Sequence, residues 1–172
     1  MLFRSVPVSP DSSGDIALVV PGSDGEPRPL IQSAEFDYSP RVSPDGEWLA
    51  YVSVDSGQPE VYVRPFPDVD GGLWTVSSDG GREPRWRQDG KELFYQSLDQ
   101  QMMAVAVETV PTFAPSVPNA LFSGDYYWSL GRHTYDVAPD GRFLMMRNVS
   151  EGASIHVVLN WLDELIERVP TS

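Results

Sequence analysis

The sequence predicts an all-β fold made of β-propeller blades, about three and a half four-stranded antiparallel blades followed by a short C-terminal helix. The first observation is an Asp-Gly pair that recurs at 45/46, 89/90 and 140/141. The second is its spacing, 44 residues from Asp45 to Asp89 and 51 from Asp89 to Asp140, close to the roughly 40 to 50 residues of one blade. The third is that 16 prolines and 14 glycines are scattered between short apolar runs, as in a protein with many strands and turns.

Each Asp-Gly pair predicts a β-hairpin. The segments 40–53, 84–97 and 135–148 align without gaps around it. Aspartate at the first position of a tight turn accepts hydrogen bonds from backbone amides, and glycine tolerates a positive φ angle. All three copies also share a leucine three positions after the glycine, at Leu49, Leu93 and Leu144.

The remaining strands follow from the apolar runs between these hairpins. A second strand pair is expected at 60–65 and 73–77, and another at 101–107 and 120–123, with the proline-rich stretch 111–118 supplying the extra length of that unit. Runs at 2–5, 15–20 and 29–32 match the last three strands of a blade whose leading Asp-Gly hairpin is missing. An apolar strand is expected at 154–159 and an amphipathic helix, capped by Asn160, at 160–169. The predicted blades are therefore residues 1–36, 37–81, 82–130 and 131–159, in a single partial propeller domain of residues 1–172.

Two of the hairpin segments carry a resemblance to a known family. Residues 43–51 read Ser-Pro-Asp-Gly-Glu-Trp-Leu-Ala-Tyr and residues 138–144 read Ala-Pro-Asp-Gly-Arg-Phe-Leu. They resemble the WD-like propeller repeat of TolB and related bacterial proteins. With Glu-Val-Tyr-Val-Arg-Pro-Phe-Pro at 60–67 and Asn-Trp-Leu-Asp-Glu-Leu at 160–165, the chain looks like the C-terminal half of the large propellers that often follow bacterial serine/threonine kinase domains. The resemblance implies a sensing or protein-binding module.

Composition excludes several functions. The net charge is −13, with 12 Lys and Arg against 25 Asp and Glu, so no basic stripe is available for nucleic acid. The chain has no cysteine, hence no disulfide and no thiolate metal site. No run reaches the roughly 20 apolar residues of a membrane helix, so membrane insertion is not expected. The compartment is not determined by these features.

The strongest binding candidates are the aromatic and cationic residues before the third hairpin. They are Tyr126, Tyr127, Trp128, Arg132 and His133. Aromatic and arginine side chains dominate binding hot spots, and loops on one face of a propeller are where partners dock. The alternative interpretation is that these aromatic rings pack between blades.

Other candidates have structural interpretations. Asp45, Asp89 and Asp140 could suggest calcium, but turn chemistry explains all three, and neither a metal nor a cofactor is expected. Trp48, Trp74 and Trp86 are expected in the core between blades. Arg41 and Arg85 occupy equivalent hairpin positions, which suggests a repeated contact to a carboxylate of the neighbouring blade, and Asp136 breaks the pattern at the third position.

The leading hypothesis is a non-catalytic module that presents the loops of one face to a protein or peptide. Its rival is a propeller hydrolase or lyase, but no Gly-x-Ser-x-Gly motif occurs, and His133 and His156 are the chain's two histidines. Closed propellers have about four to eight blades, so the predicted three and a half leave blade faces uncovered. The expectation is a homodimer that completes a ring, or a chain truncated from a longer parent.

Overall fold

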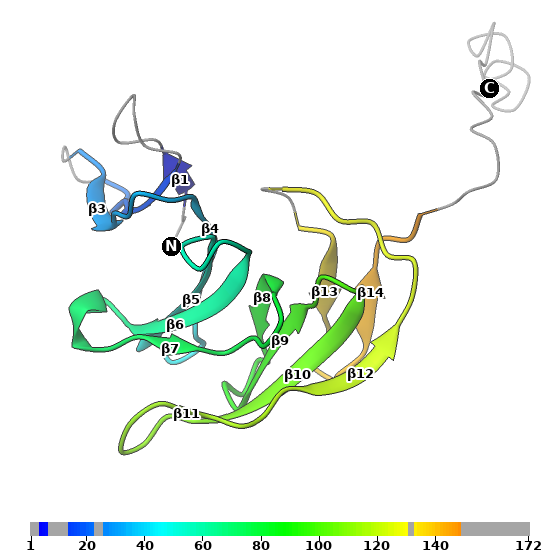
Figure 1. Ribbon diagram of the computed structural model, residues 1–172. Helices are drawn as coiled ribbons and strands as arrows, with labels where there is room; N and C mark the ends of the chain where they lie inside the picture. Colours follow the sequence, from blue (N-terminus) through cyan, green and yellow to red (C-terminus); the bar gives the residue numbers. More distant parts are fainter. Residues whose placement is uncertain (1–3, 7–13, 23–25, 131–132, 149–172) are drawn as a thin grey trace, which may run out of the picture.

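The computed structural model describes residues 4–6, 14–22, 26–130 and 133–148, and these form an all-β fold of antiparallel sheets. The predicted all-β class is thereby confirmed. A three-stranded sheet comes first, followed by four-stranded, five-stranded and two-stranded sheets that succeed one another along an arc (Figure 1). The expected strand at 154–159 and helix at 160–169 lie outside the described residues. No helix in the described part of the chain is long and apolar enough to span a bilayer.

The sheets use consecutive strands. The first sheet contains β1 (Arg4–Val6), β2 (Asp15–Leu18) and β3 (Arg28–Ile31). The second contains β4 (Asp37–Val42), β5 (Trp48–Ser53), β6 (Glu60–Pro65) and β7 (Trp74–Thr75), with the 3-10 turn η1 (Val69–Gly71) before β7. The third contains β8 (Arg82–Trp86), β9 (Glu92–Gln96), β10 (Gln101–Glu108), β11 (Ala114–Pro115) and β12 (Asn119–Ser123). The last pairs β13 (Tyr135–Val137) with β14 (Phe143–Met145).

The three Asp-Gly pairs close the hairpins β4–β5, β8–β9 and β13–β14, as predicted. The aspartate, however, is the third residue of each turn and not the first, because the glycine N–H closes the turn onto the carbonyl three residues earlier. Each carboxylate accepts a hydrogen bond from the amide two residues on, at 3.1 Å for Asp45, 3.0 Å for Asp89 and 3.2 Å for Asp140. The glycines take φ angles of 81°, 72° and 85°, which a side chain would strain. Turn chemistry thus accounts for the recurring aspartates.

The third hairpin differs from the other two by one residue. Val42 pairs with Leu49 and Trp86 with Leu93, whereas the equivalent Val137 pairs with Phe143 and not with Leu144. A shift of one residue moves every side chain of a strand to the other face. Leu49 and Leu93 are accordingly fully buried, and Leu144 is 77% exposed. The ungapped alignment of the three leucines was therefore wrong for the third copy.

The second sheet packs against both of its neighbours through its first strand, β4. This strand lies against β8 of the third sheet and against β1 and β2 of the first sheet. The core between the second and third sheets is aromatic. Phe113, from the loop between β10 and β11, is 2% exposed, with its ring centroid 5.1 Å from that of Trp48, 5.5 Å from Trp74 and 6.3 Å from Trp86. The predicted placement of the three tryptophans between sheets is confirmed, and the proline-rich insertion supplies the ring that joins them.

Candidate functional site

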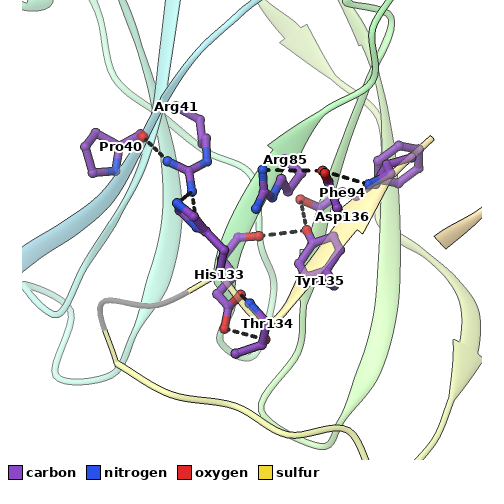
Figure 2. A network of polar contacts seen from close by, with 10 residues as sticks. Pro40, Arg41, Arg85, Phe94, His133, Thr134, Tyr135 and Asp136 are labelled. Atoms are coloured by element: carbon purple, nitrogen blue, oxygen red, sulfur yellow. Dashed lines mark hydrogen bonds and ion pairs between the residues drawn. The ribbon is translucent and has the colours of Figure 1, made fainter. Parts of the chain in front are cut away.

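The first strands of three successive hairpins bring equivalent residues to one place. Arg41 on β4, Arg85 on β8 and Asp136 on β13 occupy the same position of the aligned repeat. Figure 2 shows them with His133, which lies two residues before the start of β13. We call Arg41, Glu83, Arg85, His133 and Asp136 the inner-strand site.

A bulge aims each arginine. The register of β4 against β5 shifts between Tyr38 and Arg41, and the register of β8 against β9 shifts between Arg82 and Arg85. Each bulge holds one residue other than glycine in the left-handed region, Ser39 at φ 54° and Glu83 at φ 50°, followed by a proline. Proline fits a bulge because it has no amide proton to give to the ladder. The repeated bulge therefore turns both guanidinium groups toward the same region.

Glu83 anchors the third hairpin to the third sheet. Its carboxylate is buried and accepts hydrogen bonds from Thr134 N at 2.9 Å and Thr134 Oγ1 at 2.8 Å. Burial raises the pKa of Glu83, and the two hydrogen bonds from Thr134 oppose that rise. The hydroxyl of Tyr135 donates to the carbonyl of Glu83 at 2.7 Å, and burial raises its pKa as well. These contacts hold β13 beside β8.

The two arginines have different partners. Arg85 lies 3.5 Å from a carboxylate oxygen of Asp136, whose side chain is 71% exposed. Arg41 donates through Nη1 to the carbonyl of Pro40 at 2.7 Å and through Nη2 to the imidazole of His133, 2.8 Å from Nε2. The predicted contact to a neighbouring carboxylate thus holds for Arg85 and not for Arg41. Asp136, which broke the repeat in the sequence, is the partner of Arg85.

Burial and neighbouring positive charge lower the pKa values of Arg41 and His133. Burial, and then the neighbouring Arg85, lowers the pKa of Arg41 to about 10. Burial and then the charges of Arg41 and Arg85 lower the pKa of His133, against a smaller opposing effect of Asp136. Arg41 Nη2 lies near both ring nitrogens, and because a guanidinium only donates, it is the unprotonated nitrogen of the neutral ring that can accept. This arrangement favours an incoming anion over an incoming cation.

A hollow opens beside this site. It has a volume of about 600 Å³, and its border includes the polar side chains of Arg85, His133 and Asp136 and the apolar side chains of Leu144 and Met146. The hollow therefore combines cationic and apolar walls, which is the composition of a site for an amphipathic ligand such as a peptide.

The predicted site residues separate into two groups. Tyr126 packs edge-on against Phe122, with ring centroids 5.9 Å apart, and Tyr127 is 39% exposed. The guanidinium of Arg82, the first residue of β8, lies over the ring of Trp128, with its Cζ 4.0 Å from the ring centroid.

His133 belongs instead to the inner-strand site, through Arg41. Arg132 lies outside the described residues. Sequence reasoning missed Glu83 and Thr134 and treated Arg41 and Arg85 only as structural residues. Their equivalent positions in adjacent repeats were the available signal.

Comparison with known proteins finds similarity to TolB over part of the chain, and no family model matches. The Tol-Pal system protein TolB of Xanthomonas campestris pv. campestris is 42% identical over 66 residues, which is 38% of this chain and 15% of that protein. The Tol-Pal system protein TolB of Methylobacillus flagellatus is 48% identical over 54 residues, 31% of this chain and 12% of that one. The matches thus span less than a sixth of these curated relatives.

Among solved structures, TolB from Acinetobacter baumannii aligns over 87% of this chain and 47% of its own, with a TM-score of 0.49 and 15% identity. The partial sequence similarity to bacterial TolB, together with the all-β antiparallel sheets, supports a TolB-like β-propeller fold.

Proposed function

We propose that this chain is a non-catalytic binding module that presents the inner-strand site to a protein or peptide partner. One observation carries the proposal. Three successive hairpins bring Arg41, Arg85 and Asp136 together, next to the exposed His133 and a hollow of about 600 Å³. Fold alone does not name a function, so the argument depends on this site. The similar TolB proteins are described as members of the Tol-Pal system, which is consistent with a module that works through protein contacts.

The surroundings of His133 favour binding over catalysis. In a catalytic triad, the histidine lies between a hydroxyl or thiol that gives it a proton and a carboxylate that orients it. The ring of His133 faces the guanidinium of Arg41, which offers neither, and two cations lower its pKa. The rival interpretation as a hydrolase or lyase finds no support in this geometry.

The proposal includes self-association. On the third hairpin the one-residue register shift turns Leu144 and Met146 outward, 77% and 51% exposed. Exposed apolar side chains on a sheet face favour contact with another sheet. With about three and a half predicted blades, a second copy that covers this face is the simplest way to complete a ring. The resemblance to propellers that follow bacterial serine/threonine kinase domains supports a sensing role within the same proposal.

A peptide library tests the binding proposal. Phage displaying random heptapeptides are selected on the wild-type protein, and each recovered peptide is measured against wild type, Arg85→Gln and Arg142→Gln. Arg142 is a matched control, because its side chain is 84% exposed and pairs with Asp140 in its own turn.

We expect recovered peptides to bind wild type and Arg142→Gln equally and to bind Arg85→Gln at least tenfold more weakly. Peptides that bind all three proteins equally, or a selection that yields no binder, would contradict the proposed site.

A further inference from the structure

The charge of the inner-strand site is unusual for this chain. The protein carries a net charge of −13 with 12 basic residues, yet three of these, Arg41, Arg82 and Arg85, lie on the adjacent strands β4 and β8. A charge that is partly buried is costly unless an opposite charge or hydrogen bonds compensate it. The partners of these arginines therefore decide what the site can bind.

Arg41 is a half-buried cation whose hydrogen-bond partners are all neutral. Its Nη1 meets a backbone carbonyl and its Nη2 meets an imidazole, while its buried Nε has no hydrogen-bond partner within the described part of the chain. A buried charge without an ionic partner is destabilising, and a carboxylate within hydrogen-bond distance compensates it. The pKa of Arg41, lowered to about 10, agrees with a guanidinium that lacks a strong anionic partner.

Arg85 can exchange the partner it has. Its separation of 3.5 Å from Asp136 is long for a charge-assisted hydrogen bond, and the carboxylate side chain of Asp136 is 71% exposed to solvent. An ion pair whose carboxylate is largely exposed to solvent contributes little to stability. A ligand carboxylate can therefore replace Asp136 at little cost.

We propose that Arg41 and Arg85 form a carboxylate-binding site that takes the side-chain or terminal carboxylate of a partner peptide. The proposal rests on the proposed binding function and specifies the partner's chemistry. One guanidinium can bind a carboxylate through two parallel hydrogen bonds, which Arg85 can supply when it releases Asp136, and Arg41 adds a second positive charge nearby. Arg85 also borders the hollow of about 600 Å³, which leaves room for the rest of the peptide.

Three tripeptides, each acetylated at its N-terminus, test the carboxylate. Ala-Glu-Ala amide carries only a side-chain carboxylate, Ala-Gln-Ala with a free C-terminus carries only a terminal one, and Ala-Gln-Ala amide carries none. Binding to the full chain is followed by the NMR signal of the His133 ring at constant ionic strength, with inorganic phosphate as a fourth probe.

We expect at least one carboxylate peptide to give a saturable shift and to raise the pKa of His133, because an anion next to the ring stabilises its protonated form. The amide without a carboxylate should bind at least tenfold more weakly. Arg85→Gln and Arg41→Gln should lose the binding, Arg85→Lys should weaken it, and Arg142→Gln should leave it unchanged. Thermal unfolding of each variant checks that it is folded, and Arg85→Lys keeps the test valid if a glutamine variant does not fold.

Three results would overturn the carboxylate site: equal binding of the uncharged amide, binding that ignores Arg41 and Arg85, and phosphate binding as tight as that of the carboxylate peptides. The last result would assign the site to anions in general. Library peptides that depend on Arg85 but not on a carboxylate would leave the binding function intact and remove only this inference.

Discussion

The charge state of His133 is set by its neighbours and not by its own chemistry. Burial of its ring, and then the charges of Arg41 and Arg85, disfavour the protonated form in the folded protein. The unfolded chain has no such neighbours, and there the imidazole takes a proton at its ordinary pKa near 6.5. His133 thus links proton binding to the integrity of the inner-strand site.

NMR titration of His133 tests this link. We expect its pKa to lie below 6.5 in the folded protein and to rise in Arg41→Gln, which removes one of the two cations. Because the folded pKa is depressed, the contribution of His133 to stability is present above the unfolded pKa and is lost as the pH falls through the window between the two values. The signal of His133 is identified by its loss in His133→Gln. An unchanged or lower pKa in Arg41→Gln would contradict the assigned neighbour.

At the scale of the elements, bulges and turn closures decide where side chains point. The bulges of β4 and β8 present Arg41 and Arg85, and the earlier closure of the third hairpin exposes Leu144. The loop between β10 and β11 has a different role, because it inserts Phe113 among three tryptophans of two sheets. That loop therefore lies on the surface and contributes one buried ring, Phe113, to the core.

Truncating Phe113 tests the role of this loop. Phe113→Ala removes a ring that is 2% exposed, and burial losses of this kind cost about 3 to 5 kcal/mol of unfolding free energy. Val117→Ala is the matched control from the same proline-rich stretch, residues 111–118, since Val117 is 87% exposed and should change stability by less than about 0.5 kcal/mol. Urea unfolding of both variants measures the difference. Equal unfolding free energies of Phe113→Ala and Val117→Ala would show that the Phe113 ring does not stabilise the packing of the two sheets.

At the scale of the whole molecule, the proposed self-association depends on the outward face of the third hairpin. Light scattering at micromolar concentration should give the mass of a dimer for wild type. Leu144→Glu places a charge on that face and should shift the mass toward the monomer. Leu73→Glu is the matched control, because Leu73 is an exposed leucine (50%) before β7 and should leave the dimer intact. A wild-type monomer that unfolds cooperatively would argue against ring completion by a second copy.

The sequence by itself determined the all-β class, the three hairpins and the tryptophan core, because each depends on local signals. An Asp-Gly turn satisfies its own backbone groups, and alternating apolar residues select their own face of a strand. Only the tertiary structure decided that Arg85 meets Asp136, that His133 lies against Arg41 and not with Tyr126 and Tyr127, and that Leu144 points outward. These outcomes depend on the register of one strand against another and on the packing of one sheet beside the next. Contacts between residues some 50 or 90 positions apart leave no trace in the local pattern from which strands are recognised.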